Sequence, residues 1–287
     1  MYPAKLILFG EYTVLLGGRA LAMPLQQFKA YWDRSVLETD TRISGFFEYL
    51  LTNDSLKDLF DAAKMKSDLG AGLVFQSDIP LGYGLGSSGA LCAATYDTYA
   101  LTKSTDLHLL KKQLADMEAH FHGASSGTDP LICYLNQTLL LEKNNIKVLS
   151  DFSLDRTTNW QFFLLDVGFP RPHSDLIKWF VAQSEQSHYR DQVEANLLPQ
   201  VEEVITALMQ KQQHLCFDLM HEISLFQVRY FQPMIPDALR PLWMDGLSSD
   251  WFKLKICGAG GGGFFLGMTN DLERLETQID FSLILVQ

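Results

Sequence analysis

The stretch Gly84-Leu85-Gly86-Ser87-Ser88-Gly89 matches the pattern G-x-G-x-x-G and decides the fold class of this chain. The pattern is the fingerprint of dinucleotide-binding domains, but a glycine-rich loop before a helix can also bind the phosphates of a mononucleotide. A dinucleotide site needs a second strand after the helix, with an acidic residue about 20 positions beyond the glycines. The residues that follow the loop therefore separate the two interpretations.

Two helices, with no strand between them, are predicted after this loop. Residues 89–101 are rich in Ala, Leu and Tyr. Residues 106–122 carry apolar side chains at alternating spacings of three and four, which is typical of an amphipathic helix, and Gly123 is its expected end. Asp97 and Asp106 thus lie on or between helices and not at the end of a strand. The sequence disfavours a dinucleotide site and, with it, an oxidoreductase.

The loop itself is suited to binding phosphate. The P-loop pattern G-x-x-x-x-G-K-[ST] does not occur in the sequence. Ser87 and Ser88 instead stand at the start of the predicted helix, where free N–H groups and the helix dipole attract phosphate oxygens. A hydroxyl at that position can also bind Mg²⁺, which prefers oxygen ligands. A turn with a serine N-cap explains the same stretch equally well, so other segments have to decide.

Two further segments favour a phosphate site. Glu118 lies on the second predicted helix, and a loop of small residues leads from it to Asp129, although either carboxylate alone is more often simply solvated. Residues 258–263 contain five glycines in six positions between the predicted strands 252–257 and 264–268. Ordering so many glycines costs conformational entropy, so we expect the backbone there to approach a ligand closely. A flexible linker would not be flanked so tightly by strands.

The rest of the chain alternates between strand and helix patterns. A hairpin is predicted from residues 5–9 and 12–16, and a helical pattern covers residues 43–66 and much of 174–231. Residues 138–142 and 146–149 are predicted to form a second hairpin, and further strands are predicted at residues 30–37, 73–77, 161–167 and 281–286. A polar, turn-prone composition at 155–159 predicts two domains, 1–157 and 158–287.

The overall composition is that of a soluble globular protein. The 287 residues are 47% hydrophobic and 20% charged, with a formal net charge of −11. An acidic chain without a run of Lys and Arg is not expected to bind nucleic acid or an anionic membrane. Lys5 and Glu11 interrupt the apolar N-terminal stretch, which argues against a signal peptide or a membrane span. The four scattered cysteines are predicted to be buried thiols, so a cytoplasmic location is expected.

Segments spread over most of the chain resemble the GHMP kinases, the superfamily of galactokinase, homoserine kinase, mevalonate kinase and phosphomevalonate kinase. They are residues 3–12, 79–88, 126–129 and 255–263. The first, together with His122-Gly-Ala-Ser-Ser-Gly-Thr-Asp129, looks more like the mevalonate kinases than the galactokinases or the diphosphomevalonate decarboxylases. The resemblance implies an α+β, two-domain fold. The N-terminal domain would be like ribosomal protein S5 domain 2 and the C-terminal domain ferredoxin-like, with the active site in the interdomain cleft.

The resemblance also implies roles for individual residues. Asp129 matches the catalytic aspartate and Lys5 the lysine paired with it, while Ser88 and Glu118 match the Mg²⁺ ligands. The residues that match the ATP-binding loop are Gly82, Gly84, Leu85, Gly86, Ser87 and Ser88. The residues that match the substrate-binding positions are Glu11, Tyr12, Arg171, Gly258, Ala259, Gly260 and Gly261. The chemistry agrees, because a carboxylate beside an acceptor hydroxyl can take its proton and a nearby ammonium keeps that carboxylate ionised.

The expected activity is ATP- and Mg²⁺-dependent phosphorylation of a hydroxyl on a small metabolite, most nearly mevalonate or a similar hydroxy acid. Three departures from the family pattern lie where the acceptor should bind. Ala4 replaces the glycine of Pro-Gly-Lys, Tyr12 replaces a histidine, and Pro-Arg-Pro-His-Ser at 170–174 replaces a turn like Pro-Arg-Asn-Thr. Arg171 stays a candidate carboxylate clamp.

The alternatives are a phosphomevalonate, homoserine or sugar kinase, or a protein of this fold that binds ligand without catalysis. The sequence leaves open whether the chain forms a homodimer. His120 and His122 are two residues apart and lack the spacing of a zinc-binding pair on a helix, so no zinc site is expected there.

Overall fold

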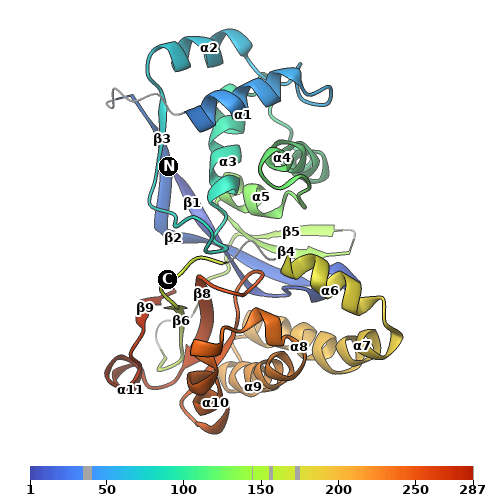
Figure 1. The fold of residues 1–287 in the computed structure, drawn as a ribbon, viewed down its shortest axis with the longest axis vertical. Helices are drawn as coiled ribbons and strands as arrows, with labels where there is room; N and C mark the ends of the chain where they lie inside the picture. Colours follow the sequence, from blue (N-terminus) through green and yellow to red (C-terminus); the bar gives the residue numbers. More distant parts are fainter. Residues whose placement is uncertain (35–40, 144, 155–157, 172–174, 287) are drawn as a thin grey trace. The chain divides into compact units, whose positions relative to one another are not determined.

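The computed structural model describes residues 1–34, 41–143, 145–154, 158–171 and 175–286 (Figure 1). These residues pack into two units. The first comprises residues 1–5, 23–80 and 85–137, and the second comprises residues 6–22, 81–84 and 138–287. Strands β1 (Tyr2–Phe9) and β2 (Ala20–Asp33) each contribute residues to both units. The division predicted at residues 157 and 158 stays a prediction.

The first unit combines an antiparallel strand pair with a group of helices. The outer end of β2 pairs with β3 (Val74–Ser77), with Ala30 opposite Ser77. Helix α3 is buried on nearly all sides, and its alanines allow close packing against α4 and α5, beside which it lies in Figure 1. The helices are α1 (Thr41–Thr52), α2 (Ala62–Gly70), α3 (Ser87–Tyr99), α4 (Leu107–His122) and α5 (Thr128–Leu135).

The helix predictions around the glycine-rich loop are confirmed. Helices α3 and α4 follow the loop in succession with no strand between them. Helix α4 begins after Asp106, whose side chain accepts hydrogen bonds from two backbone N–H groups, and ends at Gly123 with φ 75°. The single helical pattern predicted over 43–66 is in fact α1 and α2, because Ser55 donates its N–H to the Asn53 side chain in a turn and Asp61 caps a new helix.

The second unit is built on a four-stranded antiparallel sheet in the order β7-β8-β6-β9, in which Leu164 lies opposite both Leu266 and Ile284. Strand β7 is buried at every residue, and α9 and α10 pack against it. The strands are β6 (Gln161–Asp166), β7 (Phe252–Ile256), β8 (Phe264–Thr269) and β9 (Ser282–Leu285). The α-helices are α6 (Leu176–Ser184), α7 (Ser187–Gln192), α8 (Leu198–Met209), α9 (Gln213–Tyr230), α10 (Arg240–Ser248) and α11 (Leu272–Gln278).

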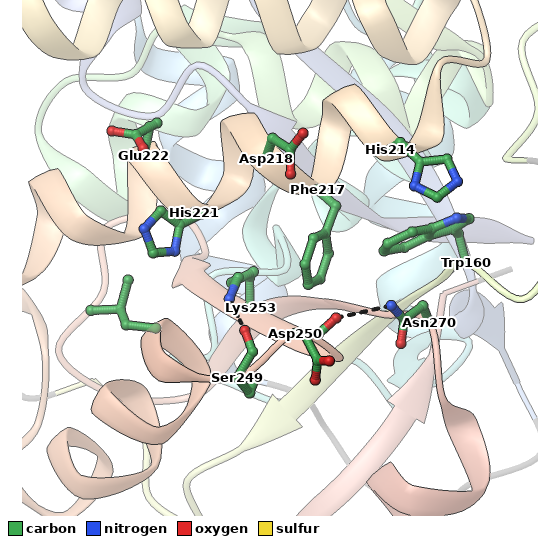
Figure 2. Close-up of a pocket in the computed structure, with 11 residues that line it drawn as sticks. Trp160, His214, Phe217, Asp218, His221, Glu222, Ser249, Asp250, Lys253 and Asn270 are labelled. Atoms are coloured by element: carbon green, nitrogen blue, oxygen red, sulfur yellow. Dashed lines mark hydrogen bonds between the residues drawn. The ribbon is translucent and has the colours of Figure 1, made fainter.

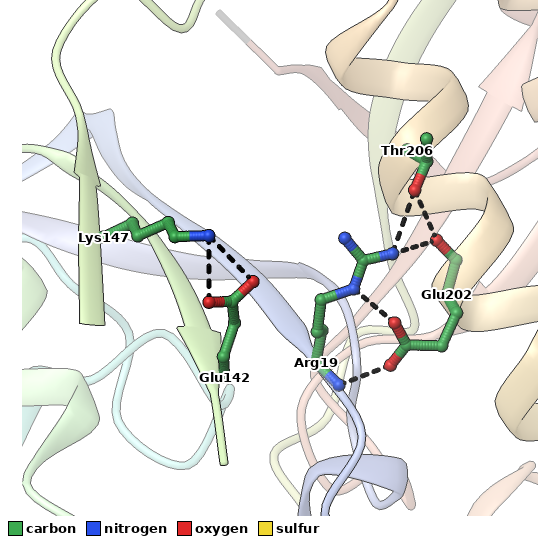
Figure 3. Close-up of polar contacts among 5 residues, drawn as sticks. All are labelled: Arg19, Glu142, Lys147, Glu202 and Thr206. Carbon is green, nitrogen blue, oxygen red and sulfur yellow. Dashed lines mark hydrogen bonds and ion pairs between the residues drawn. The ribbon is translucent and has the colours of Figure 1, made fainter. Parts of the chain in front are cut away.

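The same unit contains the predicted hairpin of β4 (Thr138–Glu142) and β5 (Asn145–Leu149), and β4 also pairs with residues 20–22 of β2. Figure 3 shows two groups of polar contacts in this unit. Lys147 pairs with Glu142 across the hairpin, and the Arg19 guanidinium donates to the side chain and carbonyl oxygen of Glu202 and to the Thr206 hydroxyl on α8. Short π- and 3₁₀-helical segments lie at η2 (Val193–Leu197), η3 (Gln232–Met234) and η4 (Asp237–Leu239).

The strand predicted over residues 12–16 is wrong, since this stretch forms the 3₁₀ helix η1 (Thr13–Leu16). The chain turns sharply at Gly10, with φ 108°, so that Val14 donates its N–H to the Gly10 carbonyl oxygen at 3.1 Å. Val14 and Leu15 are exposed, which removes the packing that favours β-branched residues in strands. The strand partner begins instead at Ala20.

All four cysteines, Cys92, Cys133, Cys216 and Cys257, are buried thiols, as predicted. Among the described residues, none of the helices has the length and apolar character needed to cross a membrane.

Candidate active site

The glycine-rich loop leads directly into α3. Gly86 caps this helix in the left-handed conformation, with φ 75° and ψ 40°, and the N–H of Lys5 donates to the Leu85 carbonyl oxygen at 2.9 Å. A Cβ atom on Gly86 would lie 2.8 Å from Lys5 Cγ and 3.5 Å from Asp129 Cβ. Only glycine fits there, and the first N–H groups of α3, from Ser87 onward, lack partners within the helix.

Lys5 and Asp129 form an ion pair beside this loop, with Lys5 Nζ 2.9 Å from Asp129 Oδ2. The lysine side chain is 5% exposed and the aspartate side chain 29% exposed, so the carboxylate remains accessible. Asp129 stands in the first turn of α5, a helix that was not predicted from the sequence. Gly89 permits this approach, because a Cβ atom there would lie 2.9 Å from the Asp129 carbonyl carbon.

Glu118 on α4 is held by two serine hydroxyls. Ser88 Oγ donates to Glu118 Oε1 at 2.9 Å, and Ser125 Oγ donates to Oε2. Burial, and after it the Asp129 charge, raise the pKa of Glu118 to about 7, against the opposing effects of the two serine hydrogen bonds and Lys5. Ser88, Glu118, Lys5 and Asp129, predicted from separate segments of the sequence, thus lie in one group.

His122 belongs to the same group, and the sequence analysis missed it. Its Nε2 lies 3.1 Å from Ser88 Oγ. From the sequence, His122 was weighed as half of a zinc pair with His120 and as the first residue of the segment that resembles the mevalonate kinases, but it received no site role. The signal that could have found it is its position four residues after Glu118, which places both side chains on one face of α4.

These residues fit a magnesium ion. The Ser88 hydroxyl and the Glu118 carboxylate are hard oxygen donors, and a cation would offset the close approach of two carboxylates that raises the Glu118 pKa. Across the described ranges, no group of three or more His, Cys, Asp and Glu side chains could hold a metal alone. Phosphate oxygens and water would therefore have to complete the coordination.

The remaining predicted residues lie in the second unit, where two of them are already engaged. Glu11 Oε1 accepts a hydrogen bond from Lys255 Nζ at 2.6 Å, and both side chains are almost fully buried. The Tyr12 hydroxyl donates to the Ala259 carbonyl oxygen at 2.7 Å. The Tyr12 ring packs against Phe180 and Phe231, and the residue is 5% exposed.

Arg171 and the glycine segments of this unit also lie together. The Arg171 N–H donates to the Gly82 carbonyl oxygen at 3.1 Å, and a Cβ atom on Gly262 would lie 2.8 Å from Arg171 N. Gly84 and Gly258 are similarly close, since a Cβ atom on Gly258 would lie 3.7 Å from Gly84 Cα. The Arg171 charge lowers the pKa of the Tyr12 hydroxyl, although burial raises it more.

The second half of the turn after Arg171, comprising Pro172, His173 and Ser174, lies outside the described residues. The predicted site residues therefore fall into one group in each unit.

A separate cavity of about 610 Å³ on the second unit contains none of the predicted residues (Figure 2). Phe217 and Asp218 of α9 and Lys253 of β7 line it. The buried Lys253 ammonium donates to the carbonyl oxygens of Gly246 and Ser249, so it holds the end of α10 against β7. Burial lowers the pKa of Lys253.

Comparisons with known proteins agree on one family. Residues 51–137 match the GHMP kinases N terminal domain. The mevalonate kinase of Pyrococcus furiosus is 29% identical over 177 residues, which cover 51% of this chain and 52% of that protein, so the match spans about half of the relative's length. The mevalonate kinase of Archaeoglobus fulgidus is 26% identical over 288 residues, covering 93% of this chain and 90% of that protein.

A crystal structure of L. major mevalonate kinase in complex with R-mevalonate has a TM-score of 0.68 at 14% identity, and the match covers 100% of this chain and 94% of that one. This likeness confirms the predicted α+β fold class.

Proposed function

We propose that the chain, whose residues 51–137 match the GHMP kinases N terminal domain, is an ATP- and Mg²⁺-dependent kinase that phosphorylates a hydroxyl on a small metabolite. The observation that carries the proposal is the ion pair of Lys5 and Asp129, 2.9 Å apart. It lies next to Gly86 at the start of α3, where there is no space for a side chain. Relatives named mevalonate kinase support the same activity.

In this proposal Asp129 is the proton acceptor. Its carboxylate would take the proton from the acceptor hydroxyl as that oxygen attacks the terminal phosphorus of ATP and the bond to the leaving ADP breaks, and the Lys5 ammonium, 2.9 Å away, would hold the carboxylate in position. The loop at 84–88 and the first N–H groups of α3 would bind the nucleotide phosphates. Bound Mg²⁺, held by Ser88 and Glu118, would neutralise charge on the phosphate oxygens.

The acceptor we propose is mevalonate or a similar hydroxy acid. Arg171 supports a carboxylate-bearing acceptor, because its planar guanidinium matches a carboxylate in a bidentate manner and a neutral sugar has no such need. Phosphomevalonate, homoserine and sugars are the other acceptors to test. Ligand binding without catalysis is less well supported, since a binding protein has no need to retain Lys5, Glu118 and Asp129 together.

The first experiment measures ADP formation with Mg²⁺ and ATP over a panel of mevalonate, phosphomevalonate, homoserine and galactose. The Asp129→Asn variant should lower kcat by roughly 10²–10⁴, the usual contribution of a positioned acid–base group, with ATP affinity near that of the wild type. Asp97→Asn is the matched control, because it breaks another Lys–Asp pair of the first unit, with Lys103, away from the loop. Asp129→Asn turnover within about threefold of wild type would remove Asp129 from this role.

A second experiment tests the acceptor class through Arg171→Met. If the acceptor carries a carboxylate, the variant should raise its KM roughly ten- to a hundredfold, since a charged hydrogen-bonded pair is lost. The KM for ATP should change little. Arg190→Met, which breaks an exposed pair with Glu194, is the control. An unchanged KM for every acidic acceptor would favour an uncharged acceptor.

A further inference from the structure

Tyr12 has an unusual backbone conformation for an aromatic residue. Its φ is 68°, and the other non-glycine residues with positive φ in the described chain are Asn136 and Lys211. A bulky side chain disfavours this region, so such a residue persists where its surroundings hold it in place. Here the ring of Tyr12 lies 4.8 Å from that of Phe180 and 5.3 Å from that of Phe231.

The Tyr12 hydroxyl reaches a loop that has almost no side chains of its own. It donates to the Ala259 carbonyl oxygen at 2.7 Å. The second half of the loop, residues 261–263, is fixed by backbone hydrogen bonds. Gly261 donates its N–H to Met234 O at 2.7 Å, and Gly263 donates its N–H to Phe169 O at 2.8 Å. The first half of the loop, residues 258–260, depends on Tyr12, since the Gly260 N–H makes only a long contact of 3.4 Å with Cys257 O.

A second contact from the same turn fixes the strand that leads into the loop. Glu11, next to Tyr12, pairs with Lys255 in β7 at 2.6 Å, and Lys255 Nζ also donates to the Ile256 carbonyl oxygen. Among the turn and loop hydrogen bonds of the described chain, none uses the N–H of Gly258 or Ala259. The loop therefore offers backbone donors at the place where the Tyr12 hydroxyl holds it.

We propose that Tyr12 is a positioning residue, which holds the loop at residues 258–263 in the conformation that binds the phosphate acceptor. It does not itself contact the acceptor, because it is 5% exposed and its hydroxyl is engaged by Ala259. The role given to the loop rests on the proposed kinase function. The contact between Tyr12 and the loop stands on the geometry alone.

The test is Tyr12→Phe, which keeps the ring between Phe180 and Phe231 and removes only the hydroxyl. Amide hydrogen exchange in a peptide covering residues 258–263 should become faster at Gly260, by up to about fivefold, the effect of losing one typical hydrogen bond, while Gly261 and Gly263 keep their own backbone partners. The acceptor KM should rise by at most the same factor, because KM increases only as the binding-competent fraction of the loop falls, while kcat and the KM for ATP stay within about twofold. Tyr49→Phe, which loses a comparable 2.8 Å bond to Asp116 O in the first unit, should change neither.

Each outcome decides a different point. Unchanged exchange at 258–263 overturns the proposal whether or not the enzyme is active. Faster exchange with a lower kcat and an unchanged acceptor KM also overturns it, because a merely structural role reduces the active fraction without changing affinity. If the wild-type chain phosphorylates no acceptor on the panel, the proposed kinase function fails, and the exchange measurement alone then decides whether Tyr12 fixes the loop.

Discussion

Among single residues, Gly86 is the one at which the backbone of the loop packs against the ion pair of Lys5 and Asp129. Gly86→Ala would place a methyl group 2.8 Å from Lys5 Cγ and 3.5 Å from Asp129 Cβ, so the Lys5 side chain has to shift and its pair with Asp129 is disturbed. We expect turnover to fall at least about tenfold, because the displaced ammonium no longer fixes the carboxylate. The left-handed backbone adds a cost of roughly 1–2 kcal/mol in the free energy of unfolding.

Gly123→Ala separates these two effects. Gly123 has the same φ of 75°, but a Cβ atom there would meet nothing within 4 Å. Its ψ of −33° lies outside the left-handed helical region that Gly86 occupies, so Gly123→Ala should lose at least as much thermal stability and keep its turnover. Equal loss of turnover in both variants would assign the effect at Gly86 to backbone strain and not to Lys5. The measurement is steady-state kinetics together with thermal unfolding of each variant.

At the scale of the element, α4 carries Glu118 and depends on its N-cap. The Asp106 carboxylate accepts hydrogen bonds from the N–H groups of Leu109 and His108, which lower its pKa. Because the pKa of this carboxyl is lower in the folded than in the unfolded chain, its ionised form stabilises the fold. This stabilisation is present above the unfolded pKa of about 3.9 and is lost as pH falls through the lower folded pKa. Asp106→Ala should therefore lower Tm at neutral pH, and the difference from wild type should shrink progressively below about pH 4.

The control for this element is Asp54→Ala. Asp54 pairs with Lys57 on the surface, with its side chain 95% exposed, so its removal should leave Tm almost unchanged. A Tm difference for Asp106→Ala that is independent of pH would mean that the charged carboxylate is not the source of the capping effect.

Elements with a strong local pattern were the ones that the sequence could predict. The regular apolar spacing and the caps of α4 predict it almost to the residue, and the loop and α3 follow from glycine and helix chemistry. The η1 segment could not be predicted, because its β-branched composition is overridden by the turn at Gly10. The contacts of Glu11 with Lys255 and of Tyr12 with Ala259 join residues distant in sequence, so no local pattern indicates them.

At the scale of the whole molecule, the second unit includes residues 6–22 as well as the C-terminal half of the chain. A fragment of residues 158–287 would leave the Lys255 side chain, 1% exposed in the full chain, without Glu11, and an unpaired buried charge is strongly destabilising. We expect this fragment to show no cooperative thermal transition and a poorly dispersed amide NMR spectrum. A well-dispersed spectrum would instead establish residues 158–287 as an independently folding domain, with the full chain as the reference.

The pairing of Glu11 with Lys255 also has a consequence for how the chain is made. The two residues are 244 positions apart, and Tyr12 and Ala259 are 247 apart. At a synthesis rate of 5–20 residues per second, the first of each pair leaves the ribosome roughly 10–50 s before its partner. During that interval the carboxylate of Glu11 lacks Lys255 and the hydroxyl of Tyr12 lacks the Ala259 carbonyl oxygen. Completion of the second unit therefore has to await the last part of translation, and a nascent chain stalled before residue 255 would lack both contacts.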